Sequence, residues 1–553
     1  MRNYFYNNKK CSHSKEMAIV TAEQSLIDAL NLPSCLVDRI LCRVPSPPIP
    51  PQPRSSTTRN SNQQQQQHSC VLYLPTVVLR KHHNPAFALA CHLANHYGVP
   101  LVVLVTVLDD QHLSRARPPL SPVTMTARRL AFLLEGLQSP RCCPAWETHG
   151  AGVAIRVHGP GNRTPHHLSL CGYAAVAAVV SDEPFVDPYR QYVRNITKTC
   201  RTAGVPFYTV DGSTSVPPNG QLVRRRNVVA TSFATTSHIV TEEYADDLSF
   251  VGAPSKAWRW EKQTAAIRQQ HVDAAYHEHQ FEAPELISKL PPNFFLGNQQ
   301  QQQQNNNNNS NNNDNNNNIA KSDNSGHYKY LLARLPLKWK DREMAAPGQR
   351  PFTVLELGAI ADCKAWAMTW HGADASVPPC AQTHGSYQAA KRRWRSFSTH
   401  TKIASSSSSG LKDYAKQRNG IGKPHAVSRM SCYLNLGIVS IFEILQEVWE
   451  IKTTRKGYAT GCNKFLDEVI KWREGSYVHA FAHPNYHTVD VLPLWSRRYL
   501  ESQLQRNKNR STSSTGYDYK ELERAATTDA TWNAMQKYLI DTGELHNNAR
   551  MTW

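Results

Sequence analysis

Residues 100–108 have the sequence PLVVLVTVL, in which every position after the proline is leucine or β-branched. A nearly continuous apolar run of this length is typical of a strand buried on both faces of a parallel sheet. Residues 71–74 (VLYL) form a shorter run of the same kind, and residues 85–96 have the apolar spacing of an amphipathic helix. A strand, a helix and a second strand in this order predict two parallel strands joined by a helix.

The alternation of strands and helices continues toward the C-terminus. We expect a helix over residues 126–137, strands over 153–157 and 173–180, a helix over 188–203 and a strand over 205–210. This order predicts an α/β domain over residues 70–211, built on a doubly wound parallel sheet with helices on both faces. Two GxG pairs, at residues 150–152 and 159–161, lack the third glycine of the dinucleotide-binding fingerprint, so we interpret them as turns.

The rest of the chain differs in composition. Residues 1–69 are rich in Pro and Gln and are predicted to be a disordered tail. Residues 212–350 form a connector whose Gln/Asn tract, at 299–318, is expected to be an insertion loop. Residues 351–553 are predicted to form an α-helical second domain.

The charge of the chain restricts its partners. Lys plus Arg number 62 and Asp plus Glu number 43, which gives a formal net charge of +19 over 553 residues. This excess favours a polyanionic partner and leaves nucleic acid and an acidic membrane face open. No apolar run approaches the roughly 20 residues of a membrane-spanning helix, so we expect no segment that crosses a membrane.

The cysteines and histidines predict no metal. The 13 cysteines are an odd number without a CxxC pair, which argues against both a disulfide scaffold and a zinc site. We expect reduced thiols and an intracellular location, with the nucleus favoured over an organelle. His479, His483 and His487 recur every four residues, but Pro484 interrupts that helix.

Two stretches near the C-terminus combine polar and aromatic residues. In HAVSRMSCYLNLGIVS, residues 425–440, a Ser-Arg-Met-Ser cluster precedes an apolar helix, where N–H groups and hydroxyls could hold phosphate oxygens. An ordinary N-cap would have the same pattern. Further on, Glu468 and Trp472 are four residues apart and share a helix face. The alternative there is that Trp472 packs in the core and Glu468 pairs with a lysine.

A basic stretch at residues 391–395, KRRWR, could face DNA, although a solvated helix face has the same composition. Two further tryptophans, Trp532 and Trp553, lie in otherwise amphipathic stretches. Taken separately, each of the two is explained by a position in the core.

Taken together, these stretches resemble the photolyase/cryptochrome family, and most closely its class II cyclobutane pyrimidine dimer photolyases. The resemblance is strong from Leu411 to the end of the chain and patchy before it. The spacing of Glu468 and Arg473 favours class II, because the two residues are one position closer in class I. The matching motifs are Tyr414 with Arg418-Asn419, Ser428-Arg429-Met430-Ser431-x-Tyr433-Leu434, Glu468-x-x-x-Trp472-Arg473-Glu474, Pro484-Asn485-Tyr486, Leu492-Pro493-x-Trp495, Trp532-Asn533-Ala534-x-Gln536 and Arg550-Met551-x-Trp553.

The resemblance implies that the helical domain binds FAD and splits pyrimidine dimers in UV-damaged DNA under light, through one electron that the flavin supplies and takes back. It assigns Glu468 and Trp472 to lesion contacts, and Trp532 and Trp553 to electron transfer. The chain is expected to act as a monomer, and an antenna chromophore of unidentified chemistry is compatible with the α/β domain. The residues assigned to FAD are Tyr414, Ser428, Arg429, Met430, Ser431, Leu434, Asn547 and Arg550, and those expected to contact DNA are Arg473, Lys391, Arg392 and Arg393.

The chain departs from the family in places. Met430 and Cys432 stand where relatives often have Leu and Pro, and Asn547 is nearer class I than class II. The chain ends at Trp553, before helices that complete the flavin pocket in family members. A fragment or truncated gene model with weak or absent FAD binding is therefore expected. Two alternatives stay open: a cryptochrome-like blue-light photoreceptor without repair activity, and a DNA-binding relative without flavin. The pairing of Glu468 with Trp472 favours repair.

Overall fold

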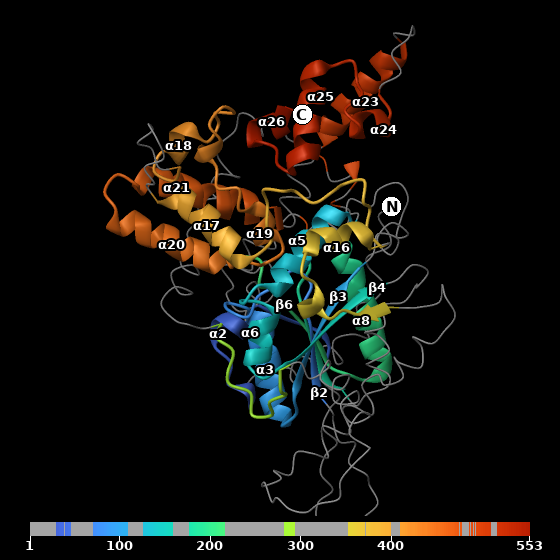
Figure 1. The fold of residues 1–553 in the computed structure, drawn as a ribbon, viewed down its shortest axis with the longest axis vertical. Helices are drawn as coiled ribbons and strands as arrows, with labels where there is room; N and C mark the ends of the chain where they lie inside the picture. Colours follow the sequence, from blue (N-terminus) through green and yellow to red (C-terminus); the bar gives the residue numbers. More distant parts are fainter. Residues whose placement is uncertain are drawn as a thin grey trace, which may run out of the picture. The chain divides into compact units, whose positions relative to one another are not determined.

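The computed structural model describes residues 29–37, 39–45, 70–108, 125–158, 176–215, 281–292, 352–370, 372–399, 410–474 and, with short gaps, 476–552. The chain divides into two compact units (Figure 1). The sheet unit comprises Met1–Gly212, Gln280–Ser376 and Leu436–Ile438. The helical unit comprises Ser213–His279, Val377–Asn435 and Val439–Trp553.

The sheet unit contains a seven-stranded sheet in the order β1-β6-β5-β2-β3-β4-β7. The five central strands are parallel to their neighbours, and the two edge strands, β1 and β7, run antiparallel. The parallel α/β fold predicted from the apolar runs is therefore confirmed, with antiparallel edges added to it. The strands are β1 (Ile40–Val44), β2 (Cys70–Leu74), β3 (Leu101–Val107), β4 (Gly152–His158), β5 (Val176–Asp182), β6 (Phe207–Val210) and β7 (Phe352–Val354).

Helices cover both faces of this sheet, as the β2 side chains show by alternation. Leu72 belongs to a buried cluster with Ile196 of α8 (Tyr189–Ala203). Tyr73 points the other way, where its ring lies 6.1 Å from Phe87 of α3 (Pro85–Tyr97) and 6.0 Å from Trp146 of α6 (Cys143–Thr148). The sheet is thus doubly wound. The other helices of this unit are α2 (Ser34–Val37), α5 (Ala127–Gln138), η3 (Leu357–Ala359) and α16 (Cys363–Thr369).

A buried carboxylate stands where β2 and β5 end, at the point from which the chain builds the sheet in opposite directions. Asp182 Oδ2 accepts hydrogen bonds from the backbone N–H groups of Thr76, Val77 and Val78, at 2.7, 2.9 and 2.9 Å. Its Oδ1 accepts from the Tyr73 hydroxyl at 2.8 Å. Burial raises the pKa of Asp182, and these hydrogen bonds oppose that rise. In doubly wound folds this position commonly receives a ligand, and here an internal side chain uses its N–H groups.

The structure differs from the predicted boundaries in two places. Residues 34–44, expected within the N-terminal tail, form α2 and β1, and Ile40 pairs with Val210 of β6. Residues 352–376, expected in the helical domain, belong to the sheet unit through β7 and α16. The prolines after residue 44 and the short β7 concealed these edge strands. The Gln/Asn tract at 299–318 and most of the remaining predicted tail lie outside the described residues.

Within the described residues, the regular elements of the helical unit are all helices, joined by turns and loops. Its core includes the fully buried Trp394, whose ring lies 5.7 Å from that of Phe397 and 5.4 Å from that of Phe465. None of the chain's described helices is both long and apolar enough to span a membrane. The elements are α17 (Tyr387–Ser398), α18 (Tyr414–Gln417), η4 (Pro424–Ala426), α19 (Ser431–Asn435), α20 (Ile441–Thr454), α21 (Ala459–Asp467), the π-helix η5 (Glu468–Arg473), α23 (Leu494–Asn509), α24 (Tyr519–Glu523), α25 (Ala530–Thr542) and α26 (Asn547–Thr552).

Candidate active site

Glu468 and Trp472 lie on η5, which continues directly from α21. The four-residue spacing predicted a regular helix face, and the structure has a π-helix instead, an arrangement that recurs at functional sites. The Trp472 side chain is 54% exposed, so it does not pack in the core. Glu468 Oε1 lies 2.8 Å from Lys464 Nζ, so the lysine pairing considered as an alternative is present. The indole is therefore accessible to a ligand, with the Glu468 carboxylate on the same element.

A second cation also contacts Glu468. Arg418 Nη2, at the end of α18, lies 3.0 Å from Glu468 Oε1. On the first residue of α18, burial raises the pKa of Tyr414 to about 12, and the nearby charge of Glu468 adds to the rise. Burial by itself lowers the pKa of Lys464, but Asp467 and Glu468 more than offset it and raise that pKa. At neutral pH the Tyr414 phenol is therefore protonated beside the ion pairs that Glu468 forms with Arg418 and Lys464.

The Ser-Arg-Met-Ser cluster leads into α19, whose first residue is Ser431. Met430 and Leu434 are buried and anchor the segment. Arg429 has a φ of +54°, in the left-handed region that side chains rarely adopt. Ser428 is half-buried and Ser431 is exposed. Neither of these two hydroxyls forms a hydrogen bond to a residue that the structure describes, so both are available to a ligand.

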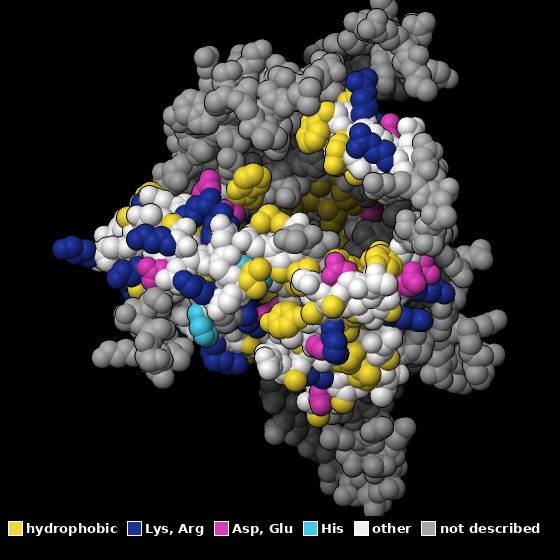
Figure 2. All heavy atoms as spheres, turned by 90° about the horizontal axis from the view of Figure 1, so that it is seen from above, with side chains coloured by type: hydrophobic (Ala, Val, Ile, Leu, Met, Phe, Trp, Pro, Cys, Tyr) yellow, Lys and Arg dark blue, Asp and Glu magenta, His cyan; other side chains and the backbone are white. Residues whose placement is uncertain are grey.

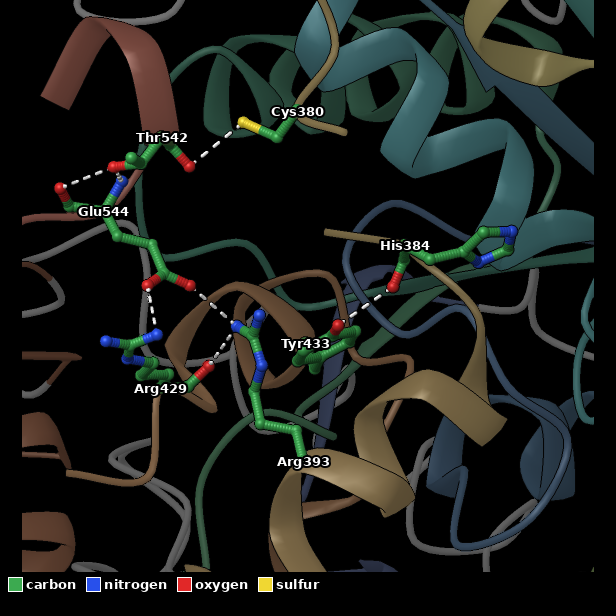
Figure 3. A network of polar contacts seen from close by, with 7 residues as sticks. All are labelled: Cys380, His384, Arg393, Arg429, Tyr433, Thr542 and Glu544. Atoms are coloured by element: carbon green, nitrogen blue, oxygen red, sulfur yellow. Dashed lines mark hydrogen bonds and ion pairs between the residues drawn. The ribbon is translucent and has the colours of Figure 1, made fainter. Parts of the chain in front are cut away.

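One carboxylate holds two arginines beside this cluster (Figure 3). Glu544 Oε1 lies 3.0 Å from Arg393 Nη1, and its Oε2 lies 3.0 Å from Arg429 Nη1. Arg393 also donates to the Arg429 carbonyl at 3.3 Å, and its guanidinium lies 5.6 Å from the centre of the Tyr433 ring. Because Glu544 follows α25, these contacts fasten the C-terminal helices to α17 and to the Ser428–Ser431 cluster. Figure 3 also draws the Cys380–Thr542, Thr542–Glu544 and Tyr433–His384 hydrogen bonds.

The C-terminal helix α26 carries two of the predicted cofactor residues. Arg550 is exposed and donates to Asn547 Oδ1 at 2.9 Å. Asn548 donates to the carbonyl of Asn419, which directly follows Arg418, at 2.9 Å. The buried Nε2 atom of His546 has no hydrogen-bond partner within the described ranges. Buried polar atoms are almost always satisfied, so this imidazole suits a polar group that binds there.

Three separate stretches of the predicted site are thus brought together. Arg418 connects α18 to η5, Asn419 connects α18 to α26, and Arg429 connects the serine cluster to the segment after α25. Sequence reasoning placed Arg418 and Asn419 in a motif without assigning them a contact, and it missed Glu544 and Lys464. The four-residue spacing of Lys464 and Glu468 was a usable signal. No local pattern predicted Glu544.

The predicted electron-transfer residues are only partly described. Trp532 is half-buried on α25, where its backbone N–H donates to Asp529, the cap of that helix. Trp553 lies outside the described residues. Their electron transfer stays a prediction.

The basic stretch on α17 does not form the expected exposed stripe. Lys391 is buried, and its ammonium pairs with Glu443 at 2.9 Å and with Glu447. Arg393 is held by Glu544. Arg392 and Arg395 are exposed and present their charges to solvent. The two-glutamate environment of Lys391 removes it as a candidate phosphate contact.

Arg473, the last residue of η5, also makes internal contacts. Its Nη1 donates to the Ser213 carbonyl at 3.0 Å, and its guanidinium lies 4.8 Å from the centre of the Tyr477 ring. The next residue, Glu474, is fully buried and accepts hydrogen bonds from both the N–H and the hydroxyl of Ser215, each at 2.7 Å. The far end of η5 is therefore tied to the segment Ser213–Ser215.

The sequence of the chain is similar to those of known proteins over part of its length. No family model matches the chain. Over 143 residues, 26% of its length, the chain is 30% identical to the deoxyribodipyrimidine photo-lyase of Arabidopsis thaliana and 31% identical to that of Methanothermobacter thermautotrophicus. These matches span 27% and 29% of the two proteins, so the chain covers little more than a quarter of their length.

Solved structures were also found to be similar. A class III photolyase from Agrobacterium tumefaciens has a TM-score of 0.44 at 14% identity, over 89% of this chain and 73% of that one. A cryptochrome from Synechocystis has a TM-score of 0.46 at 14% identity, over 87% of this chain and 73% of that one.

Proposed function

We propose that this chain, which belongs to the photolyase/cryptochrome family, is a light-dependent DNA repair lyase that splits cyclobutane pyrimidine dimers with FAD as its cofactor. The observation that carries the proposal is the exposed indole of Trp472 beside Glu468 on η5. A core tryptophan would have no access to DNA, and a protein that only senses light has no need of such a surface.

The chemistry of these two side chains suits an extruded lesion. A damaged pair costs less to unstack than an intact one, which favours its extrusion from the duplex. Stacking on an aromatic ring recovers roughly 1–3 kcal/mol per base. Glu468 would then accept hydrogen bonds from the pyrimidine N–H edge, while Arg418 and Lys464 hold its carboxylate in place. Trp472 and Glu468 would together bind and orient the dimer.

The residues available for FAD fit a group with a diphosphate and a polar ring system. The hydroxyls of Ser428 and Ser431 have no hydrogen-bond partner among the described residues, and the buried Nε2 atom of His546 has none either. Arg550 is exposed. Ser428, Ser431 and Arg550 would bind phosphate oxygens, and Asn547 would contact the ring or ribose. Arg429 fits less well, because Glu544 already neutralises it. FAD, when bound, supplies the electron that opens the dimer under light.

The protein contributes packing, orientation and charge around that chemistry. Met430 and Leu434, both buried, and Tyr414, protonated at neutral pH, would form an apolar and neutral wall that excludes water. Trp532 and Trp553 are proposed to relay electrons, since an indole can lose one transiently. These roles rest on the family resemblance and on the placement of the described residues.

DNA binding would draw on the basic excess of the chain. Figure 2 shows scattered groups of Lys and Arg side chains among acidic, hydrophobic and uncharged ones. Arg392, which is exposed, is the predicted DNA-contact residue that we propose as a contact to the DNA phosphates. Such contacts release counterions and make binding dependent on salt concentration.

The test combines a spectrum with a light assay. Titration of the purified chain with FAD should give a saturable change in the flavin absorption band, and with FAD present the chain should convert dimer-containing DNA to intact DNA under blue light. Flavin binding with dimers left intact would contradict repair and favour a photoreceptor. No flavin binding at all would contradict both functions.

A further inference from the structure

The C-terminal end of η5 contacts Ser215, a residue far away in the sequence to which the proposed function assigns no role. Glu474 directly follows η5 and is fully buried. A buried carboxylate is costly unless its oxygens are hydrogen-bonded. Both oxygens of Glu474 are satisfied by one residue, Ser215, through its N–H and its hydroxyl at 2.7 Å each. Ser215 is itself buried, so the pair is shielded from water.

A second contact reinforces the first. Arg473 donates from Nη1 to the Ser213 carbonyl at 3.0 Å and from Nη2 to the Tyr477 hydroxyl at 3.4 Å. Ser213–Ser215 is the segment with which the helical unit begins along the chain. Arg473, the last residue of η5, and Glu474, which follows it, are therefore both hydrogen-bonded to the buried segment Ser213–Ser215.

Trp472 stands immediately before these two anchored residues. Trp472 is 54% exposed, so about half of the residue is open to a ligand. At the other end of η5, Glu468 is held by Arg418 and Lys464. The backbone that carries the indole therefore has contacts at both ends of η5.

We propose that Ser215 and Glu474 are positioning residues that orient Trp472 toward the lesion. The proposal rests on the function proposed above, and it extends that function to a segment far away in the sequence. Charge-assisted hydrogen bonds such as those of Glu474 are stronger than neutral ones. Their loss should free the end of η5 and reduce the fraction of molecules in which Trp472 is placed to stack.

The test uses Ser215→Ala and Glu474→Gln in the full chain, with Tyr387→Phe as a matched control. Tyr387→Phe also removes a hydroxyl that donates to a glutamate of the helical unit, Glu443, at 2.5 Å, but on α17 and α20. Protein labelled with 5-fluorotryptophan gives a ¹⁹F signal for Trp472, assigned with Trp472→Phe. The second measurement is the ratio of affinities for duplexes with and without a single dimer.

We expect the Trp472 signal to shift or broaden in Ser215→Ala and Glu474→Gln but not in Tyr387→Phe. The preference for the dimer should fall about threefold in Ser215→Ala and about tenfold in Glu474→Gln, with affinity for undamaged DNA unchanged. If Glu474→Gln fails to fold, Ser215→Ala, which removes a single hydrogen bond, decides the question.

An unchanged signal, or a changed signal with an unchanged preference, would overturn the positioning role. A wild-type chain that does not prefer dimers would instead contradict the proposed function. In that case the fluorine signal alone still decides whether Glu474 and Ser215 orient Trp472.

Discussion

Arg418 and Glu468 form an ion pair, with 3.0 Å between Nη2 and Oε1, that joins α18 to the first residue of η5. The pair places the carboxylate proposed to bind the lesion next to the helix that begins with Tyr414, a residue proposed to contact the cofactor. Lys464 completes the arrangement from the preceding turn. The carboxylate is held from two directions before any ligand arrives, which reduces the ordering cost of binding.

Replacing the exposed indole should affect DNA binding and leave folding almost unchanged. Trp472→Ala is expected to weaken binding of a dimer-containing duplex by about 10- to 100-fold, since stacking contributes roughly 1–3 kcal/mol. Affinity for undamaged duplex should change by less than about twofold. Tyr499→Ala removes another exposed aromatic side chain, on α23, and is the matched control. Equal losses for both duplexes, measured by fluorescence anisotropy, would contradict the lesion contact.

The Glu544 contacts should stabilise the helical unit. Glu544→Ala is expected to lower the free energy of unfolding by about 2 kcal/mol, because it leaves Arg393 and Arg429 without their common acceptor. Glu544→Gln keeps one carbonyl oxygen and should cost less. A double-mutant cycle with Arg393→Ala, measured by chemical denaturation, should give a coupling of about 1 kcal/mol. A coupling near zero would show that the pair does not act together.

Tyr414 should make stability depend on pH in the alkaline range. The pKa of Tyr414 is raised to about 12 in the folded chain, against about 10 for an unfolded tyrosine. The contribution of the protonated Tyr414 to the free energy of unfolding is therefore fully present below about pH 10 and is lost as the pH rises toward 12. By pH 11 the wild type should have lost about 1 kcal/mol more than Tyr414→Phe. Parallel stability curves for the two proteins between pH 9 and 11 would contradict this assignment.

Asp182 should be essential to the sheet unit. Asp182→Ala leaves the N–H groups of Thr76, Val77 and Val78 without their acceptor and is expected to destabilise the fold by about 3 kcal/mol or more. Asp182→Asn can keep an oxygen toward these N–H groups, so it should cost clearly less. Thermal unfolding followed by circular dichroism measures both changes. Equal losses in the two variants would show that the backbone hydrogen bonds do not carry the effect.

Much of the sheet unit could be predicted from the sequence, because buried parallel strands are nearly continuous apolar runs. Residues 101–107 and 70–74 became strands as expected, and the helix after Asn84 begins where its side chain caps Phe87. The edge strands were missed for a physical reason. A strand with one neighbour can be short or only partly apolar, as Ile40–Val44 and Phe352–Val354 are.

The sequence motifs proposed the residues of the site but not the contacts between them. The motifs identified Glu468, Trp472 and the serine cluster, whereas η5 became a π-helix that spacing alone does not distinguish from an α-helix. The ion pairs of Arg418 with Glu468 and of Arg429 with Glu544 join distant parts of the chain, and only the folded packing reveals them. The basic stretch that contains Lys391 likewise gave no indication that this lysine would be buried and paired with two glutamates.

The most direct test of the central claim counts dimers in light and in darkness. The chain is incubated with FAD under reducing conditions, mixed with a duplex that carries one cyclobutane pyrimidine dimer, divided between blue light and darkness, and analysed by chromatography of the digested DNA. The account predicts loss of the dimer in light only, with Trp472→Ala at least about tenfold slower at limiting DNA. A flavin-bound chain that binds the damaged duplex and leaves the dimer intact in light would contradict it.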